Sequence, residues 1–208
     1  MSISTLIAEI QPEAFNFTAE SEAEIKQQIS KYPAGRQASA VKSLLYIVQK
    51  QNDNWIPMKA IEAVAKRLDM PVMRVLEVAS FYTMFNLKPV GKWHLQVCGT
   101  TPCMLRGSDD ISRCINDKLN ITSGETSLCG QFSLVEVECL GACVNAPILQ
   151  VNDDFYEDMD YQATASLIDK LAVDYKPEFG SVIGRQGSES EDGATTLKAV
   201  KKAASRSK

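Results

Sequence analysis

Residues 93–103 read WHLQVCGTTPC, and this stretch decides how the second half of the chain folds. Apolar and polar side chains alternate from Trp93 to Cys98, as they do in a β-strand with one buried face. A second cysteine, Cys103, follows a short turn, and apolar residues then recur at helical spacing over residues 105–119. The stretch therefore predicts a strand that ends at one cysteine and leads past a second cysteine into a helix.

A second stretch, FSLVEVECLGACVNAP at residues 132–147, has a similar arrangement. Residues 132–139 alternate like a strand, and the turn that follows holds Cys139 and Cys143. Three further elements are predicted: strands over residues 147–151 and 154–157, and a helix over residues 161–173. One strand, one helix, three more strands and a final helix make a compact α/β domain of thioredoxin-like type over residues 91–175.

The first half of the chain has the three-and-four residue spacing of amphipathic helices that share a core. Asp69 and Pro71 fit the start of the last of these helices, because aspartate caps helix N-termini and proline is tolerated in the first turn. We therefore expect an α+β protein. Its expected parts are an N-terminal tail over residues 1–18, a helical bundle over 19–88, the thioredoxin-like domain over 91–175 and an extended or disordered tail over 176–208.

The composition limits the classes of function. Residues 1–20 contain three glutamates and no lysine or arginine, and no run of 18 apolar residues occurs, so we expect no signal peptide, transit peptide or membrane insertion. A chain that is not exported keeps its thiols reduced. Its six cysteines therefore indicate metal binding or redox chemistry rather than structural disulfides.

Nucleic acid is not an expected partner. The segment over residues 91–175 holds 13 acidic and 5 basic residues, which disfavours a phosphate-binding surface there. The helices on either side of Asp69 resemble a helix-turn-helix, but the second of them offers only Arg74 as a basic residue, and Glu77 opposes it. A recognition helix needs more basic and amide side chains than this.

Four of the cysteines form two pairs, Cys98 with Cys103 and Cys139 with Cys143, and each pair follows the end of a predicted strand. If the two strands are neighbours, four thiolates meet at one edge of the sheet. Zinc accepts four cysteines at such spacings. A [2Fe-2S] cluster also takes four cysteines, two on each iron, and the spacing favours it without excluding zinc.

The surroundings of the pairs also suit an anionic cluster, because backbone N–H groups that donate to sulfur stabilise it. Such donors are expected from Gly99, Thr100, Thr101, Gly141, Ala142 and Val144. Cys103 precedes the predicted helix, whose N-terminal dipole favours negative charge. Five acidic residues follow the last pair and should lower the reduction potential: Asp153, Asp154, Glu157, Asp158 and Asp160.

The other reactive side chains have simpler interpretations. Cys114 lies on the apolar face of its helix and is expected to be a buried core residue, while Cys129 is expected to be a spare thiol in a loop. His94 is the only histidine and is expected to be an ordinary strand residue, because a Rieske centre needs two histidines. The chain also lacks a phosphate-binding glycine motif, so any NADH chemistry must belong to a partner.

Four segments of the chain resemble the family of thioredoxin-like [2Fe-2S] subunits, the E subunits, of NADH-quinone oxidoreductase (respiratory complex I). They are LEVASFYTMFN at residues 76–86, VCGTTPCMLRGS at 97–108, TSGET at 122–126 and VECLGACVNAP at 137–147. The likeness runs from about residue 20 to about residue 190, and the order of several motifs makes it specific.

The resemblance implies a helical part followed by a thioredoxin-like domain that holds one [2Fe-2S] cluster on Cys98, Cys103, Cys139 and Cys143. It implies a subunit of a proton-translocating NADH:quinone oxidoreductase, with no catalytic acid, base or nucleophile of its own. The cluster would exchange single electrons with FMN, so that FMN and NADH lie on the partner, a flavin-bearing NADH-binding subunit. A large iron–sulfur subunit is the other expected partner.

The implied location is the bacterial cytoplasm, in the peripheral arm at the cytoplasmic face of the inner membrane, in preference to the mitochondrial matrix face. Subunits of this kind also occur as diaphorase subunits of NAD-linked hydrogenases and formate dehydrogenases, and a zinc-stabilised interaction module is a further alternative. Residues 184–197 resemble the extended segment of alphaproteobacterial and mitochondrial complex I, which favours the first assignment.

Two features depart from the family pattern. Gly99 stands where a threonine is expected, which changes one hydrogen bond near the site. The basic end of the chain, residues 198–208, matches no part of the family and has no assigned role.

Overall fold

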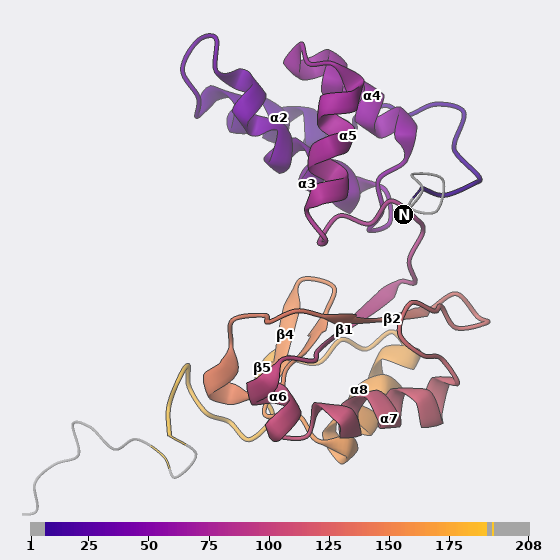
Figure 1. Ribbon diagram of the computed structural model, residues 1–208, viewed down its shortest axis with the longest axis vertical. Helices are drawn as coiled ribbons and strands as arrows, with labels where there is room; N and C mark the ends of the chain where they lie inside the picture. Colours follow the sequence, from indigo (N-terminus) through magenta and orange to yellow (C-terminus); the bar gives the residue numbers. More distant parts are fainter. Residues whose placement is uncertain (1–6, 191–192, 194–208) are drawn as a thin grey trace, which may run out of the picture. The chain divides into compact units, whose positions relative to one another are not determined.

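A computed structural model describes residues 7–190 and residue 193, and it divides the chain into two compact units (Figure 1). The first unit comprises the described residues up to Trp93 together with Thr126–Ser133. The second comprises His94–Glu125 and the described residues from Leu134 onward. The basic end predicted at residues 198–208 lies outside the described part. No helix in that part combines the length and the apolar character that a bilayer crossing requires.

The first unit is helical, as the spacing of its apolar residues predicts. Its elements are α2 (Ala19–Ser30), the short 3-10 helix η1 (Gln37–Ala40), α3 (Val41–Gln51), α4 (Met58–Leu68) and α5 (Val72–Phe81). The Thr18 hydroxyl accepts a hydrogen bond from the Ser21 N–H at 3.2 Å and caps α2. The helices share one core, which includes the fully buried Ile25, Leu44, Leu45, Ile61, Val64 and Val75.

The predicted start of α5 is wrong in detail. Asp69 does not cap α5 but ends α4, with φ of 52° in the left-handed region that aspartate tolerates better than most residues. Pro71 is the N-cap of α5 and does not lie within its first turn. The Met70 N–H closes the end of α4 by donating to the Ala65 carbonyl at 2.9 Å.

The sheet has five strands in the order β2-β1-β3-β4-β5. They are β1 (Trp93–Cys98), β2 (Phe132–Val137), β3 (Leu149–Val151), β4 (Asp154–Glu157) and β5 (Gly180–Ser181). β3 pairs antiparallel with both β1 and β4, whereas β4 and β5 are parallel. Trp93 N donates to Gln131 O and Gly99 N donates to Val137 O, so β1 and β2 run in the same direction.

Helices α7 (Ser108–Leu119) and α8 (Tyr161–Ala172) lie side by side and cover one face of this sheet (Figure 1). Buried side chains of both helices face the buried positions of β1 and β3. These are Ile111, Cys114, Ile115, Leu167 and Leu171 from the helices, and Leu95, Val97, Leu149 and Val151 from the strands. The mixed sheet with its covering helices confirms the predicted α+β class.

Several elements differ from the sequence predictions. The helix expected over residues 105–119 begins only at Ser108, as α7, and a separate short helix, α6 (Thr101–Leu105), precedes it, because Gly107 adopts a φ of 103° that interrupts the helical path. β3 begins at Leu149 and not at residue 147. β2 ends at Val137, two residues before the predicted end. β5 lies in the segment expected to be a tail, where Gly180 and Ser181 pair with Tyr156 and Glu157.

Replacing Ile61 by alanine should destabilise the helical unit by about 2 to 5 kcal/mol, because Ile61 is fully buried and its truncation leaves a cavity. Lys66→Ala is the matched control, since Lys66 is exposed on the same helix. Urea unfolding followed by circular dichroism measures both. An Ile61→Ala midpoint equal to that of the control would contradict the assigned core.

Candidate metal centre

The structure brings the two cysteine pairs to one edge of the sheet, as predicted. Cys98 is the last residue of β1 and Cys103 lies in α6. Cys139 follows β2 by two residues, and Cys143 begins the 3-10 helix η2 (Cys143–Asn145). Since β1 and β2 are neighbours in the sheet, their two cysteine-bearing turns start from adjacent strand ends.

The sulfur atoms of Cys139 and Cys143 lie close together, 3.5 Å apart. The Cys98 sulfur lies 3.2 Å from the Thr100 hydroxyl. Cys98 and Cys103 share a small buried cluster with Ala146 and Ile148, against which Leu140 packs. The turn of the second pair thus covers the first pair.

The two pairs differ in exposure. Cys98 and Cys103 are each 1% exposed, whereas Cys143 is half-buried and Cys139 is exposed. The site therefore has an inner pair that water does not reach and an outer pair at the surface.

The surroundings shift the thiol pKa values in opposite directions. Burial raises the pKa of Cys103 to about 12. Burial also raises that of Cys98, but hydrogen bonds from Thr100 and from the Leu140 backbone outweigh it and leave a pKa below the usual value. At Cys139, the Gly141 backbone N–H donates to the sulfur at 3.4 Å and lowers the pKa. Donors thus favour the anionic form of one sulfur in each pair.

The donor predictions are partly corrected. Gly141 and Thr100 donate backbone hydrogen bonds to sulfur as expected, but the Gly99 N–H donates to the Val137 carbonyl at 3.2 Å and belongs to the sheet. Leu140, which was not expected, donates to Cys98. Cys103 does not stand just before the start of its helix but is the third residue of α6. Burial raises its pKa, so the stabilisation of its thiolate that was expected from a helix dipole is not observed.

The donor set is four cysteine thiols in two pairs, each held by its own turn. This set suits a [2Fe-2S] cluster, in which each iron takes two cysteines. Zinc also accepts four cysteines, at about 2.3 Å from each sulfur.

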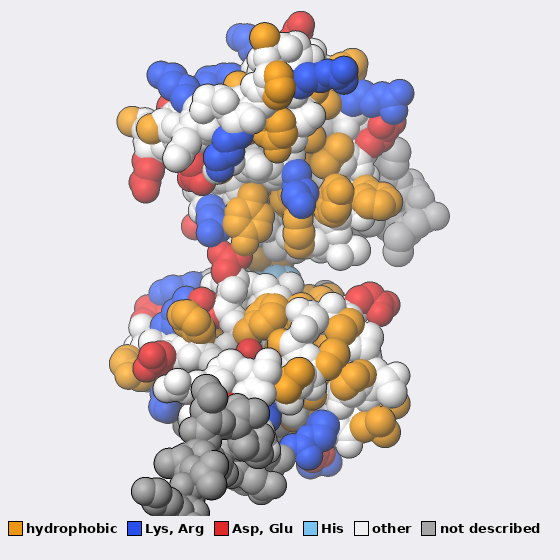
Figure 2. Space-filling view, turned by 90° about the vertical axis from the view of Figure 1, so that its left-hand side faces the viewer, with side chains coloured by type: hydrophobic (Ala, Val, Ile, Leu, Met, Phe, Trp, Pro, Cys, Tyr) orange, Lys and Arg blue, Asp and Glu red, His pale blue; other side chains and the backbone are white. Residues whose placement is uncertain are grey.

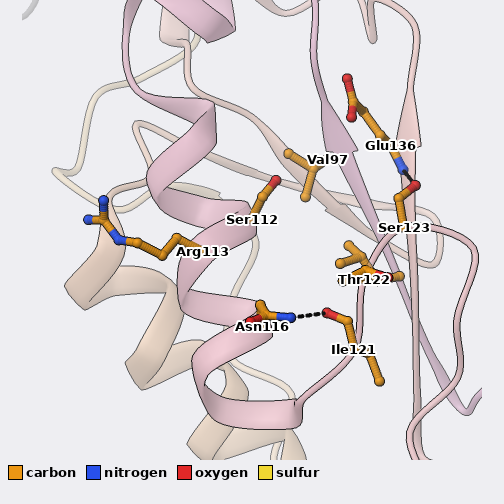
Figure 3. Close-up of a pocket in the computed structure, with 9 residues that line it drawn as sticks. Val97, Ser112, Arg113, Asn116, Ile121, Thr122, Ser123 and Glu136 are labelled. Atoms are coloured by element: carbon orange, nitrogen blue, oxygen red, sulfur yellow. Dashed lines mark hydrogen bonds between the residues drawn. The ribbon is translucent and has the colours of Figure 1, made fainter.

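A groove lies beside this edge of the sheet, between α7 and β2 (Figure 3). Its lining includes Val97 and Glu136, but none of the four paired cysteines. The Glu136 N–H donates to the Ser123 hydroxyl at 2.8 Å. The Glu136 side chain crosses Gly99, where an added Cβ would lie 2.1 Å from its carboxylate oxygen. The glycine thus gives this flexible carboxylate room that a threonine would take.

The remaining predicted residues lie where the sequence places them. Cys114 is fully buried in α7 and Cys129 is exposed. His94 is a strand residue of β1, and its main chain exchanges hydrogen bonds with Asn152. None of the six cysteines, all of which lie in the described part of the chain, forms a disulfide.

Taken together, the thioredoxin-like sheet and the four-thiol edge define a ferredoxin of the thioredoxin-like class. The family model described as thioredoxin-like [2Fe-2S] ferredoxin matches residues 25–172. The chain belongs to this family, and within it to the group of E subunits of NADH-quinone oxidoreductase. The family description carries the cofactor that the cysteine pairs predict, one [2Fe-2S] cluster.

Named relatives support this assignment. The E subunit of NADH-quinone oxidoreductase from Rickettsia bellii is 53% identical over 160 residues, which cover 77% of this chain and 96% of the relative. NADH dehydrogenase (ubiquinone) flavoprotein 2, mitochondrial, of Dictyostelium discoideum is 44% identical over 183 residues, 88% of this chain and 74% of the relative.

A solved structure shares the fold at lower sequence identity. The air-oxidised NAD+-reducing [NiFe]-hydrogenase superposes with a TM-score of 0.55 at 17% identity, over 62% of this chain and 23% of the hydrogenase chain. This likeness concerns the fold alone.

His94 should make stability depend on pH. Burial lowers its pKa to about 4, and its Nδ1 is buried without a hydrogen-bond partner. In the unfolded chain, His94 takes up a proton near pH 6.5. The stability that neutral His94 gives the folded chain is therefore complete above that pH and is lost as the pH falls towards 4. The loss should reach about 3 kcal/mol. Unfolding free energies at pH 5 and pH 7 should therefore differ less in His94→Leu than in the unsubstituted protein, and equal differences would contradict this.

Cys129 should react with iodoacetamide at pH 7.5 much faster than Cys114. It is exposed, and the Ser127 hydroxyl lowers its pKa, so more of it is thiolate at that pH. Burial raises the pKa of Cys114, which should stay unlabelled. Mass spectrometry of the labelled peptides measures both, and Cys129→Ser should remove the fast phase. Equal labelling of the two thiols would refute the assignment.

Proposed function

We propose that this chain is an electron-transfer subunit of a proton-translocating NADH:quinone oxidoreductase, and that Cys98, Cys103, Cys139 and Cys143 bind its [2Fe-2S] cluster. The observation that carries the proposal is the meeting of two cysteine-bearing turns at the ends of neighbouring strands. The 53% identity to the Rickettsia bellii relative supports the choice of complex. The chain would exchange single electrons with FMN on a neighbouring NADH-binding subunit.

The chain's own residues bind and shield the cofactor. A [2Fe-2S] cluster supplies one-electron transfer when bound. The buried inner pair keeps water from one side of the site, and the Gly141 and Leu140 N–H groups direct positive charge towards sulfur. None of these groups acts as a catalytic acid, base or nucleophile in this proposal.

The acidic segment after Cys143 contributes less negative charge than its sequence indicates. Asp158 pairs with Arg185, and Asp154 pairs with Lys176. Two of the five carboxylates expected to lower the reduction potential therefore have cationic partners. Their effect on the potential is correspondingly smaller.

The surface near the cysteines offers a place for the flavin-bearing partner. Apolar side chains are interspersed among charged ones on the face in Figure 2. Close to the cysteines in sequence, Met104, Leu105 and Val144 are 49%, 77% and 63% exposed. Exposed apolar groups beside a cofactor site are typical of protein–protein contacts. In complex I that contact would be with the NADH-binding subunit, with the large iron–sulfur subunit nearby, in the arm at the cytoplasmic face of the membrane.

The assembly could instead be a soluble NAD-linked hydrogenase or formate dehydrogenase, since an NAD+-reducing hydrogenase shares the fold. Affinity purification of the full-length chain from the membrane and soluble fractions of its native cells distinguishes the two. Recovery with a flavoprotein and a large iron–sulfur protein in the membrane fraction supports complex I. Recovery only with a soluble hydrogenase or formate dehydrogenase would replace it.

Cys139→Ala should abolish the EPR signal of the dithionite-reduced protein, because it removes one of four iron ligands. Cys129→Ala is the matched control, since Cys129 is also exposed and lies outside the pairs, and it should keep the full signal. The unsubstituted protein should absorb visible light and bleach on reduction, whereas a zinc protein is colourless. Full signal in Cys139→Ala, or a colourless unsubstituted protein, would refute the cluster assignment.

A further inference from the structure

A C-terminal strap, residues 180–190, belongs to the second unit and lies beyond the family-matched region of 25–172. The strap begins with β5, which pairs with β4 in parallel, and the Val182 N–H continues this ladder by donating to the Glu157 carbonyl at 3.1 Å. Tyr156 secures the approach to the strap through its hydroxyl, which donates to the Pro177 carbonyl at 3.0 Å.

Arg185 is the centre of the strap's side-chain contacts. Its guanidinium pairs with the Asp158 carboxylate through two nitrogens, with Nε 3.0 Å from Oδ2 and Nη2 against Oδ1. The side chains of Arg185 and Asp158 are only 9% and 5% exposed. A pair this buried needs further hydrogen bonds, and the Ser181 hydroxyl supplies one to Asp158.

The guanidinium also contacts the turn that carries the outer cysteine pair. Nη2 lies 3.3 Å from the carbonyl oxygen of Val144, the residue after Cys143, and Nη1 donates to the Glu189 carbonyl at 2.9 Å. One side chain thus joins the end of β4, the cysteine turn and the strap itself.

Asn145 provides a second connection between the same parts. Its side chain is buried, and its Nδ2 donates at 2.6 Å to both the Gly187 carbonyl of the strap and the Glu157 carboxylate of β4. The Asp158 N–H in turn donates to the Asn145 carbonyl at 2.8 Å. Asn145, the last residue of η2, is therefore joined both to the strap and to the end of β4.

We propose that Arg185 is a positioning residue for the cluster site, and that the strap completes this site. The Arg185–Asp158 pair fixes the Val144 carbonyl, and with it the direction in which the Cys143 sulfur projects from the turn. This inference rests on the proposed role of Cys143 as an iron ligand. It extends the functional unit beyond the ligands and beyond the family-matched region.

Arg185 positions the cysteine turn, whereas Lys176 only attaches the segment before the strap. Lys176 also ties the segment before the strap to β4, through Asp154, but its ion pair lies at the other end of that strand. Loss of the Lys176 pair should loosen the approach to the strap and leave the cysteine turn in place. Loss of Arg185 should release the turn while β5 stays paired.

The test uses the full-length protein with its cluster and the variants Arg185→Gln, Arg185→Lys and Lys176→Gln. EPR of the reduced protein gives the g-values, which report ligand geometry, and the decay of visible absorbance in EDTA gives the rate of cluster loss. Arg185→Gln should change the g-values and lose the cluster roughly 10-fold faster, the lower end of the effect of removing an outer partner of a metal ligand. Lys176→Gln should match the unsubstituted protein.

Arg185→Lys tests the inference if Arg185→Gln does not fold. Lysine keeps the positive charge, but it lacks the planar guanidinium that binds the Asp158 carboxylate and the Val144 carbonyl at the same time. It should fold and still show altered g-values. Unchanged g-values and decay in the folded Arg185 variants, or equal changes in Lys176→Gln, would overturn the inference. An unsubstituted protein without any cluster signal would instead refute the proposed function.

Discussion

The parallel pairing of β1 with β2 is the constraint on which the site depends. The Gly99 N–H donates to the Val137 carbonyl at 3.2 Å, which aligns the ends of two strands whose last residues are Cys98 and Val137. That alignment places each cysteine turn beside the other. A slip of the register would carry the turns apart and turn buried side chains to the other face of the sheet.

Sequence reasoning found most of the site because its signals are local. Alternation locates the two strands, and cysteines just beyond their ends locate the thiols. It placed Cys139 on β2, although the strand ends earlier. It also missed α6 and began the helix of residues 105–119 too early, because helical spacing alone does not show that Gly107 takes a left-handed conformation. It counted Gly99 among the sulfur donors, since sequence does not show which N–H groups the sheet has already used.

The contacts of the strap lie beyond sequence reasoning for a different reason. Residues 180–190 are rich in glycine, serine and charge, and a two-residue strand has too few positions to show alternation, so the sequence predicts only an extended or disordered segment there. Their order comes from hydrogen bonds to distant parts of the chain, such as Arg185 to Asp158 and Asn145 to Gly187. Such contacts depend on tertiary structure, so only the fold reveals that a polar segment of this composition is held in place.

The two cysteine pairs differ in how close they lie to the surface. On the side of Cys98 and Cys103, buried protein separates the sulfurs from the surface, whereas Cys139 lies at the surface itself. If the four cysteines bind the cluster as proposed, a redox partner that docks over the outer pair would exchange electrons faster than one that docks behind the inner pair, because electron transfer slows steeply with distance. The protein on the buried side would then shield the cluster from electron exchange with other molecules.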